Sequence, residues 1–255
     1  MVLTRLEAFN YWQRSAIIAV VSLLLAGLCE YTEVFRRFDN TIADAHAQLL
    51  APAVSFSNLV IIDVDEDTIA RLQPALGAWP YEREVFGLIT DYLLRAGVRA
   101  IAYDIVFSEG RKGDAEFAAT LDARVVLAAA DLENSLRRDA AYNKMLAEKS
   151  WPSDAGFAGE RRRDITLPRA ALLALARAGV ISAPTDSDGV LRRVPLRHIV
   201  EGVEGRALPS LPLALLYADV APPPLATRAG KISAGASAWP VNANGQVALR
   251  FPSNL

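Results

Sequence analysis

Residues 59–107 read LVIIDVDEDTIARLQPALGAWPYEREVFGLITDYLLRAGVRAIAYDIVF, and this stretch decides the fold. Its first part, Leu59–Val64, is an almost continuous apolar run, which is typical of a strand covered on both faces. Apolar residues then recur at helical spacing from Glu82 to Gly97, where the glycine is a stop signal. A second buried strand is predicted over Arg99–Phe107. Strands that alternate with helices indicate a parallel or mixed sheet with helices packed on it.

The alternation continues toward the end of the chain. Helical spacing and apolar runs predict helices at 114–121, 167–179 and 208–217, and strands at 124–130, 179–183, 190–200 and 246–251. Residues 131–164 are polar and weakly periodic, so we predict a surface insertion in which Glu160–Asp164 is a solvated loop. The predicted fold class is α/β, with a mixed, mostly parallel sheet and flanking helices.

The most hydrophobic uncharged run is Ser15–Cys29, SAIIAVVSLLLAGLC. A membrane-spanning helix needs about 20 apolar residues, so the run alone is short. Aromatic residues typical of the membrane interface flank it, Tyr11 and Trp12 before and Tyr31 after. We therefore predict one transmembrane helix from Tyr11 to Tyr31. A cleaved signal peptide and a buried core helix are the alternatives.

Arg5 and Arg14 outnumber Glu7 on the amino side of the uncharged run, so the positive-inside rule predicts a cytoplasmic N-terminus at the bacterial inner membrane. The residues after Tyr31 then lie in the periplasm or outside the cell. Apolar residues at steps of three or four predict a juxtamembrane helix over 33–50. The predicted domains are residues 1–31, the cytoplasmic N-terminus and transmembrane helix, and residues 32–255, an extracytoplasmic domain with an α/β body over 58–255. Because the chain stops directly after a strand, we expect that body to be truncated.

The composition argues against several classes of protein. Lys and Arg number 27 against 29 Asp and Glu, so no nucleic-acid partner is expected. A single cysteine, Cys29, excludes an intramolecular disulfide, and the two histidines, His46 and His198, are too few for a multi-histidine metal centre. The sequence holds no glycine-rich phosphate loop, G-x-S-x-G elbow or Cys/His nucleophile pair. We therefore expect no catalytic residue, metal or cofactor, and no enzymatic activity in this chain.

An acidic group is the closest approach to a catalytic pattern. Asp63 and Asp65 share one face at the end of the first predicted strand, and Asp104 lies on the second. Ligands of open α/β sheets bind beyond such strand ends, and carboxylates suit Mg²⁺ or Ca²⁺. An exported metal-dependent hydrolase is therefore an alternative. The sequence departs from the Asp-x-Asp-x-Thr/Val motif of haloacid-dehalogenase-type phosphatases, because the fifth residue is Asp67 or Ile69, depending on the starting aspartate.

Structural roles compete with that chemistry. Asp65 or Asp67 is well placed to cap a helix N-terminus. Asp104 lies in an apolar strand, where an unpaired carboxylate is costly. A buried ion pair is therefore expected between Asp104 and one of three arginines, Arg83, Arg192 or Arg193.

Several sequence blocks, in this order, resemble the second class of CHASE domains. They follow a single predicted anchor and are Phe38-Asp39, LVIIDVDE from Leu59, GAWPYER from Gly77, AIAYDIVFSE from Ala100, Asp114, and DSDGVLRRVPL from Asp186. The blocks lie between residues 33 and 251. The matching positions that determine the fold or bind a ligand are Asp63, Asp65, Trp79, Arg83, Asp104, Asp188, Arg192 and Arg193.

The resemblance implies an extracytoplasmic sensory domain at the N-terminus of a bacterial receptor. In such receptors further transmembrane helices usually lead to a cytoplasmic output module. That module is a nucleotide cyclase such as an adenylate cyclase, a diguanylate cyclase or phosphodiesterase, or a kinase of the two-component or Ser/Thr type. The expected partners are the membrane, an unidentified small-molecule or envelope ligand, and a second copy in a homodimer. A non-sensory envelope scaffold is the remaining alternative.

Overall fold

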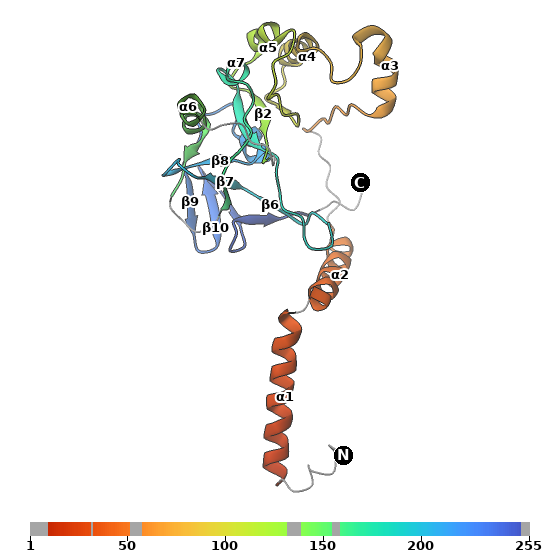
Figure 1. Ribbon diagram of the computed structural model, residues 1–255, viewed down its shortest axis with the longest axis vertical. Coiled ribbons are helices and arrows are strands. Elements are labelled where there is room, and N and C mark those ends of the chain that lie inside the picture. Colours follow the sequence, from red (N-terminus) through yellow and green to blue (C-terminus); the bar gives the residue numbers. More distant parts are fainter. Residues whose placement is uncertain (1–9, 32, 52–57, 132–138, 155–158, 251–255) are drawn as a thin grey trace. The chain divides into compact units, whose positions relative to one another are not determined.

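The computed structural model describes residues 10–31, 33–51, 58–131, 139–154 and 159–250. These residues divide into two compact units, which Figure 1 shows as ribbons. The helical unit contains α1 (Tyr11–Tyr31), α2 (Glu33–Leu49) and the segment Thr185–Val190. The α/β unit comprises Leu59–Pro184 and Leu191–Leu249.

The two helices of the helical unit have the predicted positions. α1 contains 21 residues and α2 contains 17. Among the residues that the structure describes, none of the helices combines the length and apolar character required to cross a membrane. The predicted transmembrane role of α1 therefore finds no support there. The uncharged run in α1 lies between Arg14 and Glu30 and falls short of the ~20 residues of a typical span.

The prediction of a strand over Leu59–Val64 is wrong. Residues 59–64 have no strand structure, and Val60 and Ile61 are each 82% exposed. β-branched residues favour an extended chain, but a strand forms only with a neighbour to pair with. The segment leads into α3 (Glu66–Leu76), which buries no residue and stands apart from the sheets in Figure 1.

A three-stranded parallel sheet forms the centre of the α/β unit. Its order is β1 (Ile101–Tyr103), β2 (Val125–Ala129) and β5 (Arg177–Val180), with Ile101 opposite Val125 and Val126 opposite Arg177. Successive residues of a strand face opposite sides, so β2 separates two cores. Its residues Val125 and Leu127 belong to an aromatic core with Phe86, Phe107 and Phe117, and Val126 belongs to a second core with Leu213 and Ala214.

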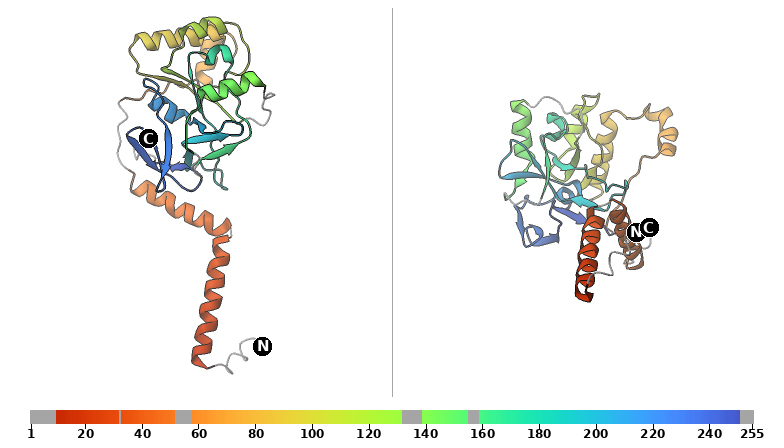
Figure 2. Two further views of the ribbon diagram at one scale, coloured as in Figure 1. Left: turned by 90° about the vertical axis from the view of Figure 1, so that its left-hand side faces the viewer. Right: turned by 60° about the horizontal axis from the view of Figure 1, so that its bottom comes forward.

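Helices cover both faces of this sheet. The aromatic core is covered by α4 (Arg83–Arg95), α5 (Asp114–Thr120) and α7 (Ala170–Leu173), and the second core by α8 (Leu211–Leu216). Figure 2 shows α4 and α5 together at the end of the unit away from its last strands. The helices predicted over Glu82–Gly97 and over 114–121 are confirmed as α4 and α5. The helix predicted over 167–179 is short, because Arg177–Val180 pairs with β2 as a strand.

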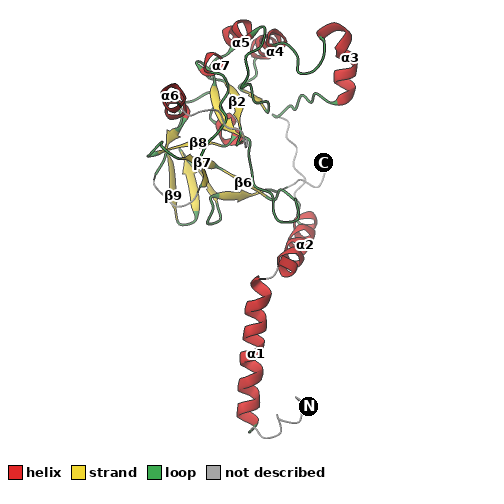
Figure 3. Ribbon diagram, in the orientation of Figure 1, coloured by secondary structure: helices red, strands yellow, loops and turns green. Residues whose placement is uncertain are grey.

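Among the described residues three further sheets complete the unit, whose strands Figure 3 shows in yellow. The four-stranded sheet has the order β3 (Trp151–Pro152), β8 (Arg206–Pro209), β7 (Arg197–Val200) and β4 (Glu160–Arg162), and α6 (Ala140–Lys149) precedes β3. The antiparallel sheet consists of β9 (Leu225–Arg228), β10 (Lys231–Ala234) and β11 (Ser237–Pro240). The last pair is β6 (Arg193–Pro195) and β12 (Gln246–Ala248).

The predicted mixed α/β class is confirmed, but the emphasis on parallel strands is wrong. Among the described strands, the pairings β1–β2, β2–β5 and β4–β7 are parallel and the other pairings are antiparallel. The charged run Glu160–Arg162 is a strand, not the predicted loop, because its backbone pairs with β7 while alternate side chains remain accessible.

Candidate functional site

A cavity of about 170 Å³ lies in the α/β unit where two parallel strands end. Asp104 follows the last residue of β1, and Val180 ends β5. Ligands of open α/β sheets bind beyond such carboxyl ends. We call this the His198 cavity; its polar lining residues are Asp104, Ser182, His198 and Ser210, and its apolar lining residues are Val180, Ile181, Ala183, Leu191, Val194, Pro195, Leu211 and Pro212.

His198 supplies the most deeply buried polar side chain of the cavity. It lies on β7 between Glu160 of β4 and Leu208 of β8, and it is fully buried. Burial, with a smaller contribution from the positive charge of Arg162, lowers the pKa of the His198 imidazole to about 3. The ring is therefore neutral at physiological pH, with one N–H donor and one acceptor nitrogen. Neither nitrogen has a hydrogen-bond partner among the described residues.

Ser210 adds a second buried polar group to the same cavity. Its backbone N–H donates to the Leu196 carbonyl at 2.9 Å, but its hydroxyl has no partner in the described part of the chain. Gly179 sets the position of this segment, because a Cβ there would lie 2.6 Å from the Leu211 Cα. The other hydroxyl of the lining, Ser182 Oγ, accepts a hydrogen bond from the Asp131 N–H at 2.7 Å and keeps its own hydrogen to donate.

Asp104 supplies the only charge among the described lining residues. Its side chain is exposed, so the predicted buried ion pair of Asp104 is wrong. The strand ends at Tyr103, one residue earlier, and Asp104 therefore reaches solvent at the strand end. Of the three arginines expected to pair with it, Arg83 instead lies 3.4 Å from Asp114, between Nε and Oδ1.

Trp79 and Arg83 come together in the aromatic core, away from the cavity lining. The Arg83 guanidinium lies 4.4 Å from the centre of the Phe107 ring, and burial lowers the pKa of Arg83. The Trp79 ring packs edge-on against Tyr81 at 5.2 Å. Both residues stabilise the packing of α4 on the sheet, so the structure gives them a role in the fold.

The remaining candidates lie at ends of elements. Asp65 caps α3: its Oδ1 accepts from the Thr68 N–H at 2.7 Å, and hydrogen bonding from the Thr68 side chain, together with that from its backbone N–H, lowers the pKa of Asp65. Asp63 lies in the exposed segment before it. Within the described residues no three His, Cys, Asp or Glu side chains form a group able to hold a metal ion. Asp63, Asp65 and Asp104 therefore do not assemble the site that the hydrolase hypothesis requires.

Asp188, Arg192 and Arg193 belong to the segment between β5 and β7. Asp188 Oδ1 accepts from the Val190 N–H at 3.1 Å and closes a turn. Arg193 pairs with Ala248 in the β6–β12 ladder, and the carbonyl of Arg192 accepts from the Leu249 N–H at 2.8 Å. These backbone contacts hold β12 in place, and none of the three residues lines the cavity.

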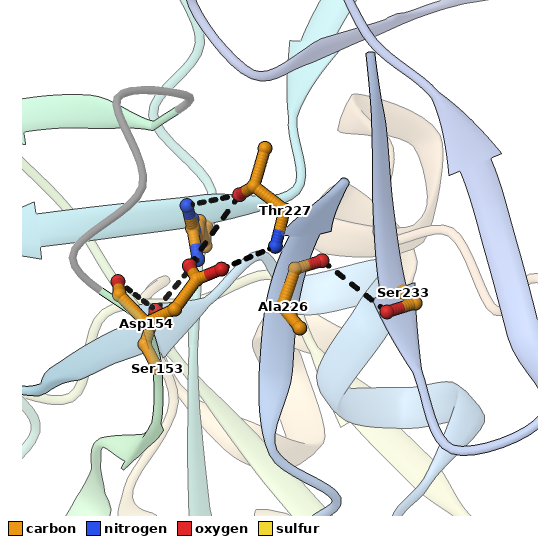
Figure 4. Close-up of polar contacts among 6 residues, drawn as sticks. Ser153, Asp154, Ala226, Thr227 and Ser233 are labelled. Carbon is orange, nitrogen blue, oxygen red and sulfur yellow. Dashed lines mark hydrogen bonds and ion pairs between the residues drawn. The ribbon is translucent and has the colours of Figure 1, made fainter. Parts of the chain in front are cut away.

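A second polar centre lies on the opposite face of β7, and the sequence patterns did not indicate it. Arg197 is fully buried and donates to Asp154 Oδ1 at 2.8 Å, to Ser153 Oγ at 2.7 Å and to Thr227 Oγ1 at 2.6 Å. Figure 4 shows Asp154 between Ser153 and Thr227, whose N–H donates to the second carboxylate oxygen. This Arg197 network ties β7 to β9.

His198 and Ser210 are the functional candidates that sequence reasoning missed. His198 entered only as one of two histidines. The available signal was the pair Arg197-His198 inside the strand-like run 190–200. Buried charged or polar side chains in such a run are uncommon unless they are partnered.

Comparison with models of known protein families matches the CHASE2 domain over residues 15–254. The match contains α1 from Ser15 onward, the whole of α2, and each of the described lining residues of the His198 cavity. No curated protein and no solved structure matches the chain.

Proposed function

The chain belongs to the CHASE2 domain family, and on this basis we propose that it is the signal-sensing part of a bacterial membrane receptor. CHASE2 domains are extracytoplasmic sensory domains, and the match over essentially the whole chain is the observation that carries the proposal. The chain binds a signal outside the cytoplasm and passes its bound state to an output module, a nucleotide or diguanylate cyclase or a kinase. The chain itself binds and does not catalyse.

The proposal attaches the chain to the inner membrane through α1. Exposed apolar side chains such as Ile18, Leu23 and Leu24 support this attachment, because contact with lipid removes them from water. Fusions of alkaline phosphatase and of β-galactosidase after Asn58 test it in cells. An active phosphatase and an inactive galactosidase place the following domain outside the cytoplasm. The opposite pattern overturns the extracytoplasmic assignment.

The helix α2 is the proposed coupling element in a receptor dimer. It follows α1 along the chain, and apolar side chains on it, such as Ile42 and Leu49, are exposed. A ligand shifts the equilibrium between two receptor states only by its difference in affinity for them. The signal must therefore bind one arrangement of the α2 helices more tightly than the other.

Ala45→Pro tests this coupling. Proline in the middle of a helix removes a backbone donor and costs about 3 kcal/mol or more, so we expect α2 to break and signal-dependent output to be lost. The α/β unit should keep its thermal unfolding temperature, because Ala45 lies in the helical unit. Ala45→Gln, which keeps the helix, is the matched control. Normal signalling by the proline variant would eliminate α2 as the coupling element.

The coding sequence beyond Leu255 provides the direct test of the receptor assignment. Further hydrophobic spans followed by a cyclase-like or kinase-like module would support it and name the output. A stop codon at that point would favour a free-standing envelope scaffold that binds a partner.

A further inference from the structure

We propose that the His198 cavity binds a small organic ammonium compound, whose ammonium group donates hydrogen bonds to Asp104, to the acceptor nitrogen of His198 and to the Ser210 hydroxyl oxygen. This inference rests on the proposed sensory function only for its biological meaning, since binding itself depends on the cavity alone. Among the contacts of the described residues, none gives the side chains of Asp104, His198 and Ser210 another role.

The unpartnered polar atoms point to a ligand. Both ring nitrogens of His198 and the hydroxyl of Ser210 are buried and lack hydrogen-bond partners among the described residues, and both residues line one cavity. About 90% or more of buried polar groups in proteins have a partner. Three such atoms at one cavity are therefore unlike an ordinary core, and a ligand ammonium group that donates to the acceptor nitrogen of His198 and to the Ser210 oxygen restores two of the missing bonds.

The size of the cavity limits the ligand. A cavity of about 150 Å³ is known to hold one benzene molecule, so the volume of about 170 Å³ here suits roughly six to eight non-hydrogen atoms. Most of the wall is apolar, with Val180, Leu191, Val194 and Leu211 among its residues. The ligand therefore has a compact apolar body, and a sugar or a nucleotide is too large and too polar.

The charge of the lining determines the sign of the ligand. Asp104 is the charged group, and burial keeps the pKa of His198 far below neutrality, so the imidazole adds no positive charge. A carboxylate or phosphate entering the cavity would face Asp104, with no cation among the described lining residues to pair with. An ammonium group next to Asp104 gains both attraction and a charge-assisted hydrogen bond.

Three probes of nearly equal shape test this assignment: benzylamine, benzyl alcohol and benzoate. They are titrated into the full chain, purified in detergent micelles, and binding is followed by NMR and by calorimetry. We expect benzylamine to bind with a dissociation constant in the millimolar range or below. Benzyl alcohol should bind several-fold more weakly, and benzoate should not bind.

Variants locate the binding. Asp104→Asn should remove the preference for benzylamine over benzyl alcohol, a loss of roughly tenfold in affinity for the amine, since a charge-assisted hydrogen bond is about twice as strong as a neutral one. His198→Phe should abolish binding of both, and Ser210→Ala should weaken both while leaving the fold intact. Asp67→Asn is the control, because that carboxylate is 84% exposed on α3 and does not line the cavity.

Each result has a defined meaning. No binding of benzylamine at millimolar concentration, equal binding of benzoate, or binding that Asp104→Asn and Ser210→Ala leave unchanged would overturn the inference and indicate a cavity filled by water. Amine binding that leaves the output of the full-length receptor unchanged would support the cavity and overturn only its sensory role. An output that responds to a different signal in a receptor that binds no amine would preserve the sensory function and overturn the cavity assignment.

Discussion

The two faces of β7 handle buried polarity in opposite ways. Arg197 and His198 are neighbours in sequence, both are fully buried, and they point to opposite sides of one strand. Arg197 reaches three side chains at hydrogen-bond distance, whereas neither nitrogen of His198 reaches any in the described residues. A satisfied network stabilises a fold, and an unsatisfied one leaves bonds for a ligand. The contrast separates a structural centre from a binding site.

The largest effect is expected on the satisfied face. Asp154→Ala removes a carboxylate from the buried Arg197 guanidinium; removal of one partner of a fully buried pair costs about 3–5 kcal/mol, and the 36% exposure of Asp154 reduces the expected cost to about 2–3 kcal/mol. We expect the free energy of unfolding to fall by that amount in urea denaturation. Asp67→Ala, at an exposed carboxylate, is the control and should change it little. A loss below 1 kcal/mol would mean that the Arg197 network is not a structural centre.

Gly179→Ala tests how the cavity is positioned. The added Cβ would lie 2.6 Å from the Leu211 Cα and 3.1 Å from the Leu211 backbone nitrogen, so backbone atoms must move. Overpacking of this kind costs about 1–3 kcal/mol, and here it should also displace Ser210 and weaken binding in the cavity. Thermal unfolding and benzylamine titration measure the two effects. Gly27→Ala is the control, since nothing lies within 4 Å of its Cβ position.

The pH dependence of the free energy of unfolding tests the burial of His198, which lies on the face of β7 opposite Arg197. The pKa of His198 is about 3 in the folded protein and ~6.5 when unfolded, so below pH 6.5 only the unfolded chain takes up a proton there. Stability from this group is complete above pH 6.5 and decreases as the pH falls toward 3, by about 2 kcal/mol between pH 6.5 and pH 5. His198→Leu should remove that decrease. An equal slope in both proteins would show that His198 is not buried as a neutral ring.

The sequence predicted elements whose own apolar pattern matches their burial in the structure. The helix Arg83–Arg95 and the strand Val125–Ala129 follow from their apolar spacing and buried position. Leu59–Val64 has the same apolar character, but its secondary structure depends on a distant edge, and no local pattern reports whether that edge is available. The segment Glu160–Arg162 shows the opposite error. Its polar composition predicted a loop, but backbone pairing with β7 makes it a strand.

The candidate site was predicted only in part for the same reason. Asp104 was predicted inside a buried strand, but the strand ends at Tyr103 and Asp104 lines the cavity from an exposed position. Arg83, one of the three arginines expected to pair with it, lies at ion-pair distance from Asp114. His198 and Ser210 meet only after β5, β7 and the segment before α8 have packed together. Unsatisfied hydrogen bonds are a property of that packing. A residue type or spacing along the chain does not encode them.

Ser210→Ala produces the smallest expected change in the free energy of unfolding. The hydroxyl is buried without a partner in the described residues, and an unpartnered buried group costs about 1–3 kcal/mol. Its removal leaves a space smaller than one methyl group, so we expect the unfolding free energy to rise by up to about 1 kcal/mol, or to stay unchanged. Urea denaturation without ligand measures this. Ser153→Ala, on the satisfied face, should destabilise because it removes an acceptor from Arg197. If both variants lost stability equally, Ser210 would have a partner, and the two faces of β7 would not differ in the way that the binding proposal requires.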